Sequence, residues 1–111
     1  MVTRLNSLRR AYLKRREQLR TAMFAAGPAC DDTTADLFTA PDVFESEPDT
    51  VRQEREAAAK RICRTCPARP QCLAYALDIR PTEGVWAGLS VEEIRALSLF
   101  GIAPNVEQEV A

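Results

Sequence analysis

Residues 62–90 read ICRTCPARPQCLAYALDIRPTEGVWAGLS and hold three of the four cysteines and the single tryptophan of this 111-residue chain. The first half has the spacing Cys63-x2-Cys66-x5-Cys72, and the second half places Trp86 between two glycines. Two thiolates separated by two residues can converge on one metal or one face of a cluster. We therefore expect the chain to fold around a sulfur site in this stretch.

The fourth cysteine, Cys30, precedes Cys63 by thirty-two intervening residues. Three local ligands and one remote ligand suit a single four-thiolate site. Zinc ribbons usually present two close pairs of ligands, and only one such pair exists here, so the spacing fits an iron-sulfur cluster at least as well as zinc. A structural zinc site and a redox pair formed by Cys63 and Cys66 remain the alternatives.

The composition excludes several chemistries. The chain has no histidine, which removes Ser-His-Asp and Cys-His catalysis and histidine ligation of metals. If the four cysteines form a metal or cluster site, as we expect, the protein is not an enzyme. No segment has the length of a membrane span or the pattern of a secretory signal, so we expect a cytoplasmic protein with no membrane contact, in which cysteines act as ligands or redox groups.

The N-terminal residues 1–27 are predicted to form a basic amphipathic helix that ends near Gly27. Residues 1–24 contain seven basic side chains against Glu17, although the whole chain has a formal charge of -1. This helix either packs on the domain with a solvated basic face, or forms an arm that contacts nucleic acid or an acidic partner. The candidates for such contacts are Arg9, Arg10, Lys14, Arg15, Arg16 and Arg20.

Residues 28–100 are predicted to form one small all-α domain, which makes about four helices with the N-terminal one, and residues 101–111 a frayed tail. After an acidic loop with a short helical turn at 34–38, Ser46 offers an N-cap for a helix running into Cys63. A second helix begins near Pro67 or Pro70 and ends near Arg80. Ser90 and Glu93 form a capping-box pattern for the last helix.

The sequence GVWAGLS at 84–90 predicts a tight turn. Gly84 and Gly88 allow positive φ or close approach of the backbone, so the turn can present Val85 and Trp86 outward or over a neighbouring site. A single tryptophan is commonly a core residue, but one held in a turn beside a metal site is also well placed to anchor an interface.

These features together resemble the WhiB-like family of actinobacterial and phage transcription regulators, over about residues 28–98. The matching motifs are Cys30 followed by DLF at 36–38, the Cys63-x2-Cys66-x5-Cys72 run, RPQCLAYAL at 69–77, and GVWAG at 84–88 followed by LSVEEIRAL.

The resemblance implies a helical domain built around a [4Fe-4S] cluster held by the four cysteines. It also implies binding to the C-terminal domain of a principal sigma factor within RNA polymerase, at promoter DNA, with a response to redox change or nitric oxide through the cluster. The residues implied at the partner interface are Phe38, Gly84, Val85, Trp86 and Gly88.

The chain departs from the family pattern in two places. Ala87 stands where the family turn usually has glycine, so a methyl group occupies a position that can require positive φ. The family's basic C-terminal tail is also missing, because no positive charge follows Arg95. Direct DNA contact through that end is therefore not expected.

Overall fold

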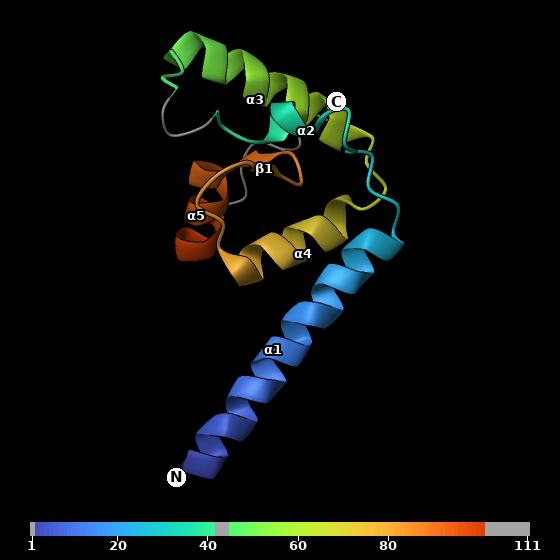
Figure 1. Cartoon of the computed structure of the whole chain (residues 1–111), viewed down its shortest axis with the longest axis vertical. Coiled ribbons are helices and arrows are strands. Elements are labelled where there is room, and N and C mark those ends of the chain that lie inside the picture. Colours follow the sequence, from blue (N-terminus) through green and yellow to red (C-terminus); the bar gives the residue numbers. More distant parts are fainter. Residues whose placement is uncertain (1, 42–44, 102–111) are drawn as a thin grey trace.

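The computed structural model describes residues 2–41 and 45–101, and it confirms the expectation of a small all-α domain (Figure 1). The helices are α1 (Val2–Ala25), α2 (Ala35–Phe38), α3 (Asp49–Arg64), α4 (Arg69–Ile79) and α5 (Val91–Phe100). A two-residue antiparallel hairpin, β1 (Val85–Trp86) and β2 (Leu89–Ser90), joins α4 to α5. Of the predicted tail, only Gly101 belongs to the described residues.

Local sequence signals explain the ends of several helices. The capping box of α5 is complete, since the Ser90 hydroxyl accepts from the Glu93 backbone and the Glu93 carboxylate accepts from the Ser90 backbone. Gly101 ends α5 with φ 63°, and Gly27 follows α1 with φ 75°. These features match the sequence prediction.

The start of α3 differs from the prediction, because Pro48 rather than Ser46 is its N-cap residue. A helix capped by Ser46 would need Glu47 in a helical conformation, and proline disfavours that conformation in the residue before it. Glu47 instead forms a double ion pair with Arg55, at 2.8 and 3.0 Å. Arg55 also donates to the Leu37 carbonyl at 3.2 Å, which ties α2 to α3.

The core is small and lies on two sides of the hairpin. One cluster contains Ala59, Cys63 and Val85. The other contains Ala76, Leu89 and Ile94, with Trp86 packed at its edge. No large side chain among the described residues is fully buried, so a bound group tying the segments together would add stability that the core does not supply.

Helix α1 extends away from the rest of the molecule, and only its C-terminal part packs on α4 (Figure 1). Met23 is buried, whereas Leu5, Leu8 and Tyr12 are exposed. The predicted apolar stripe is therefore a packing surface only near its C-terminal end. None of the described helices is long and apolar enough to cross a lipid bilayer.

Candidate metal centre

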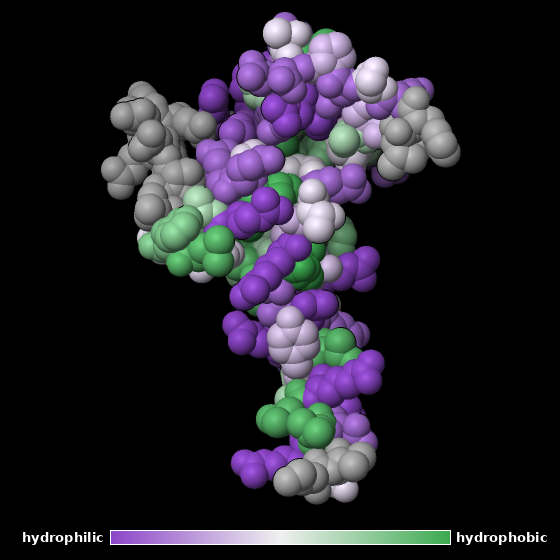
Figure 2. Space-filling model, turned by 90° about the vertical axis from the view of Figure 1, so that its left-hand side faces the viewer, coloured by the Kyte–Doolittle hydropathy of each residue, from purple (hydrophilic) through white to green (hydrophobic). Residues whose placement is uncertain are grey.

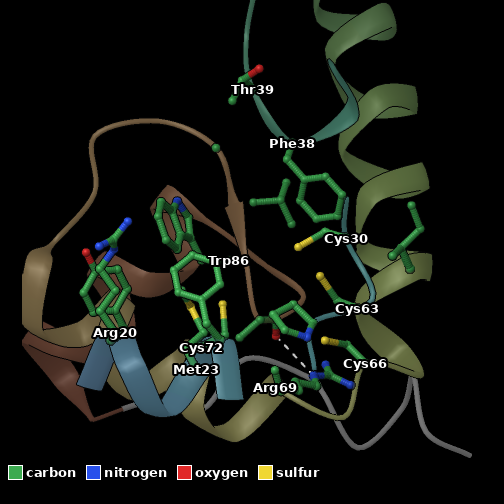
Figure 3. A pocket seen from close by; sticks show the side chains of 18 of the residues that line it. Arg20, Met23, Cys30, Phe38, Thr39, Cys63, Cys66, Arg69, Cys72 and Trp86 are labelled. Carbon is green, nitrogen blue, oxygen red and sulfur yellow. Dashed lines mark hydrogen bonds between the residues drawn. The ribbon is translucent and has the colours of Figure 1, made fainter. Parts of the chain in front are cut away.

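All four cysteines line one cavity of about 420 Å³. Cys30 comes from the loop after α1, Cys63 from the last turn of α3, Cys66 from the connection to α4, and Cys72 from α4 itself. Figure 3 shows the sulfur atoms of Cys30, Cys63 and Cys66 along one side of the cavity, with Cys72 across from them. The predicted long-range convergence of Cys30 on the other three is thus present in the structure.

Backbone hydrogen bonds fix the local cysteine run. The Cys66 N–H donates to the Cys63 carbonyl at 3.1 Å, and the Arg69 N–H donates to the Cys66 carbonyl at 3.3 Å. The Cys72 N–H then donates to the Ala68 carbonyl at 2.8 Å as α4 begins. These bonds turn the chain between α3 and α4, and residues 63, 66 and 72 line the same cavity (Figure 3).

A hydrogen bond to a cysteine sulfur holds the loop that carries Cys30 against the segment from Cys63 to Cys72. The backbone N–H of Ala29 donates to Sγ of Cys66 at 3.3 Å. A hydrogen bond to a sulfur ligand is one of the features that tune the reduction potential of an iron-sulfur centre. The bond therefore holds the loop that carries Cys30 beside Cys66.

Burial is the main influence on the free thiols. It raises the pKa of Cys72 from 9.0 to about 11, and it raises the pKa of Cys30 and of Cys63, with further increases from the neighbouring cysteines. The backbone amide of Ala87 opposes the shift in the pKa of Cys72, and the amide of Gly88 opposes it for Cys63. The thiols are thus close enough to repel one another as thiolates, and the hairpin amides face them.

The hairpin loop consists of Ala87 and Gly88, since Trp86 pairs with Leu89 across the strands. Ala87 has φ 54° and Gly88 has φ 80°, which meets the type I′ requirement for positive φ at both central residues. The sequence pointed to this strain at Ala87, where the family usually has glycine. The position does adopt positive φ, and alanine occupies it.

Arg69 is the residue beneath the turn. Its Nε donates to the Ala87 carbonyl at 3.1 Å, and its charge opposes the rise in the pKa of Cys63. A Cβ on Gly88 would come within 2.8 Å of the guanidinium, so a larger residue there would have to displace Arg69 as well as adopt positive φ. Of the arginines that flank the cysteines in sequence, Arg61 and Arg64 point to solvent.

The rim of the cavity is aromatic. Trp86 and Phe38 lie at one end of it in Figure 3, and Tyr75 packs on Trp86 with ring centroids 6.2 Å apart. The Trp86 Nε1 donates to the Glu83 carbonyl at 2.9 Å, which fixes the ring. A Cβ on Gly84 would meet the Phe38 carbonyl oxygen at 2.9 Å, so this glycine allows the α2 loop to approach the hairpin.

The five residues implied at a partner interface are not equally accessible. Trp86 and Phe38 are partly exposed, whereas Val85 is buried against Ala59 and Cys63, and Gly88 is buried over Arg69. Val85 and Gly88 therefore support the turn from inside the domain.

Helix α1 contributes to the same cavity, which the sequence did not reveal. Arg20, Met23 and Phe24 line it, and the Arg20 guanidinium lies 5.2 Å from the centre of the Phe24 ring. Arg16 is engaged by Asp78 on α4, at 2.9 Å. The other candidate phosphate contacts, Arg9, Arg10, Lys14 and Arg15, are exposed.

The arrangement of the thiols favours some bound groups over others. Within residues 2–41 and 45–101, no three histidine, cysteine, aspartate or glutamate side chains come together as a site for a single metal ion. The four cysteines instead line a cavity of about 420 Å³ together with residues of α1, the α2 loop, α4 and the hairpin. Four thiolates can hold an iron-sulfur cluster or a tetrahedral zinc ion, and the single close pair, Cys63 and Cys66, is one fewer than zinc sites usually present.

The fold and the cavity define a small helical protein organised around a four-thiol centre. The family model for "Transcription factor WhiB" matches residues 25–97. The chain therefore belongs to the WhiB family of transcription factors.

Three relatives illustrate the likeness. The transcriptional regulator WhiD of Streptomyces coelicolor is 42% identical over 77 residues, which cover 69% of this chain and 64% of WhiD. The redox-responsive transcriptional regulator WhiB3 of Mycolicibacterium smegmatis is 37% identical over 66% of this chain and 73% of its own length. The transcriptional regulator WhiB1 of Bifidobacterium longum is 39% identical over 65% and 73%. The chain thus spans less than two thirds of WhiD.

Proposed function

We propose that this protein is a transcription regulator that holds a [4Fe-4S] cluster with Cys30, Cys63, Cys66 and Cys72 and responds through it to redox change or nitric oxide. The observation that carries the proposal is the cavity of about 420 Å³ lined by all four cysteines. Similarity to WhiB3, named as redox-responsive, supports the redox part. When bound, such a cluster would supply iron that reacts with oxygen or nitric oxide.

Two observations argue against the alternative functions. A thiol-disulfide oxidoreductase needs an accessible thiol of lowered pKa, whereas Cys63 is 6% exposed and burial raises its pKa. A structural zinc site usually presents two close pairs of ligands, and this chain has only the pair Cys63 and Cys66. The cluster remains the bound group that the donor set suits best.

The residues of this chain that would sense the state of the centre are those of the hairpin. The amides of Ala87 and Gly88 face Cys72 and Cys63, and Arg69 holds the Ala87 carbonyl from below. Trp86 is adjacent in the same strand pair. If Cys63 and Cys72 moved when the centre was lost, their contacts with the amides of Gly88 and Ala87 would break. The turn would then shift, and the Trp86 ring would shift with it.

We propose the C-terminal domain of a principal sigma factor as the partner, bound at the rim formed by Trp86 and Phe38. Tryptophan is among the residues most enriched at binding hot spots, and this one is partly exposed beside an apolar cavity. The sigma factor would bring the regulator to promoter DNA within RNA polymerase.

The first experiment is anaerobic purification of the full chain with a visible spectrum and assays of iron, sulfide and zinc. We expect close to four irons and four sulfides per chain, and Cys63→Ala should lose both the absorbance and sigma-factor binding. Thr65→Ala is the matched control, since Thr65 lies exposed between two cysteines. Zinc in place of iron, or undiminished sigma-factor binding by Cys63→Ala, would refute the proposal.

A second experiment separates the partner surface from the cluster. Trp86→Ala should weaken binding to the sigma-factor domain at least tenfold while the cluster absorbance per chain is retained. Phe100→Ala is the control, because it removes an aromatic ring that is 69% exposed on α5, away from the cavity. Equal losses for both variants would show that the rim is not the binding surface.

A further inference from the structure

The N-terminal part of α1 is a helix surrounded by solvent. Every residue from Thr3 to Arg15 is exposed, and this arm contains five basic side chains and no acidic one. At about 1.5 Å per residue the arm is about 20 Å long. Figure 2 shows it as a rod below the body, with hydrophilic side chains along it and apolar ones between.

The arm is fixed to the body at its base. The Arg16 Nε donates to Asp78 Oδ2 at 2.9 Å, and its Nη2 donates to the Asp78 carbonyl at 3.3 Å and to the Tyr12 hydroxyl at 2.6 Å. Leu19 is partly buried and Met23 is buried. The direction of the arm is therefore set by α4, and its charges project at a fixed angle from the domain.

Four of the five basic side chains form two rows, and Arg9 lies more than about 100° around the helix from both of them. At about 100° per residue, Arg4 and Arg15 lie about 20° apart around the helix, and Arg10 and Lys14 lie about 40° apart. The rows are separated by about 110° on the same scale. The residues between them are small, namely Ser7 and Ala11. We call these two rows and the strip between them the basic face.

We propose that the basic face binds the phosphate backbone of duplex DNA, with Arg4 and Arg15 contacting one strand and Arg10 and Lys14 the other. A major groove admits an α-helix and has phosphates along both of its edges. Two basic rows flanking small side chains match that shape, and helix length matches about half a turn of duplex or more. This goes beyond the proposed cluster and sigma-factor functions and does not depend on either.

The geometry favours DNA over a membrane surface. A helix that lies in a membrane interface must lay a continuous apolar face on the lipid. On α1 the apolar line of Leu5, Leu8 and Tyr12 continues into Leu19 and Met23, the side on which α4 packs. The body would therefore block that line from lying flat. The centre of the basic face lies about 120° around the helix from that line, and Arg15 lies at the edge of the face that borders α4.

The test is binding of anaerobically purified full-length protein to a fluorescent 30-base-pair duplex of random sequence, between 50 and 200 mM salt. Each phosphate contact contributes about -0.9 to the slope of log affinity against log salt, so four contacts predict a slope of about -3.6 and a loss of about 150-fold. Arg10→Gln with Lys14→Gln should lower the slope to about -1.8. Glutamine has a helix propensity close to that of arginine and lysine, so the arm should stay helical.

The matched control removes two exposed charges elsewhere, through Arg52→Gln on α3 with Arg95→Gln on α5. This control should keep the slope of the unmodified protein. Equal slopes for the unmodified protein and the Arg10/Lys14 variant would overturn the proposal, as would binding to phosphatidylglycerol vesicles without binding to the duplex at 50 mM salt. Because the sigma factor is absent from the assay, failure here leaves the cluster proposal standing.

Discussion

Replacing Gly88 with alanine tests how the hairpin and the cysteine cavity are joined. Gly88 has φ 80°, and an added Cβ would lie 2.8 Å from Nη2 and 3.2 Å from Cζ of Arg69. Gly101 offers a matched comparison, because it has φ 63° and nothing within 4 Å of the same added atom. The two substitutions share their backbone strain and differ in their surroundings.

The expected magnitudes follow from that difference. Placing alanine in the left-handed region costs about 1 kcal/mol of unfolding free energy at either site. At Gly88 the guanidinium must also move, which breaks its 3.1 Å bond to the Ala87 carbonyl. Hydrogen bonds to charged groups contribute about 1.5–3 kcal/mol. We expect Gly88→Ala to lower stability by about 2.5–4 kcal/mol and Gly101→Ala by about 1 kcal/mol.

The assay is thermal unfolding of the anaerobically purified protein, followed by circular dichroism. For a chain of this size about 1 kcal/mol shifts the midpoint by about 4 °C, so the two variants should differ by about 6 °C or more. The decisive comparison repeats Gly88→Ala in an Arg69→Ala background, where the guanidinium is gone. Residues in contact give non-additive effects, so the excess over Gly101→Ala should shrink to within about 0.5 kcal/mol.

Two outcomes would refute this reasoning. One is an excess at Gly88 that persists in the Arg69→Ala background, since the Cβ would then be clashing with something else. The other is an equal loss at Gly88 and Gly101, which would mean that the guanidinium gives way without cost. In either case the hairpin would not depend on Arg69.

The remaining predictions concern single groups. In the cluster-free protein at pH 8, iodoacetamide should modify Cys72 about a hundredfold more slowly than an unperturbed thiol, because burial raises its pKa from 9.0 to about 11; equal rates by peptide mass spectrometry would contradict this. Burial acts to raise the pKa of Glu93, but hydrogen bonds from Lys60 and Ser90 outweigh it and lower that pKa. The ionised Glu93 carboxylate should therefore stabilise the fold above about pH 4.5, and this stabilisation should be lost on acidification. Urea unfolding should then show a difference in the free energy of unfolding between the unmodified protein and Glu93→Gln that is smaller at pH 3.5 than at pH 6. The same difference at both pH values would contradict this role of Glu93. Arg69→Gln should lower the reduction potential of a bound cluster by tens of millivolts, because a positive charge beside Cys63 is lost, whereas Arg61→Gln, at an exposed position, should change it little. Ala87→Gly should change the free energy of unfolding by less than about 1 kcal/mol, since relief of the strain of positive φ is offset by loss of a buried methyl group and by a more flexible unfolded chain. A larger change, measured by urea unfolding, would show that the turn carries strain besides that of the φ angle at Ala87.

Structural features that depend on residues close together in the chain were predictable from the sequence. The capping box at Ser90, the stop at Gly101 and the turn at Gly84–Gly88 each depend on residue types within a few positions. The convergence of the cysteines was also predictable, because thiol spacing carries chemical information that helix propensity does not. The N-cap at Ser46 was wrong because the effect of Pro48 on its predecessor outweighed the capping pattern.

Long-range contacts of ordinary residues were not predictable. Nothing in the sequence marks Arg69, rather than Arg61 or Arg64, as the arginine under the hairpin, because that choice depends on the direction in which α4 leaves the Cys66 turn. The same holds for Met23 and Phe24, which reach the cavity because α1 packs on α4, a contact that includes the ion pair between Arg16 and Asp78. A helical pattern shows which residues share a face but not how far along the helix its partner extends.

The hairpin is the element through which the thiols could influence the outer surface. Its loop amides face Cys63 and Cys72, its carbonyl is held by Arg69, and its first strand carries Trp86 at the cavity rim. A two-residue turn with positive φ at both positions has little conformational freedom. Because close-packed segments transmit displacement rather than absorb it, we expect a change in the bonding of either sulfur to displace the turn, and the Trp86 ring with it.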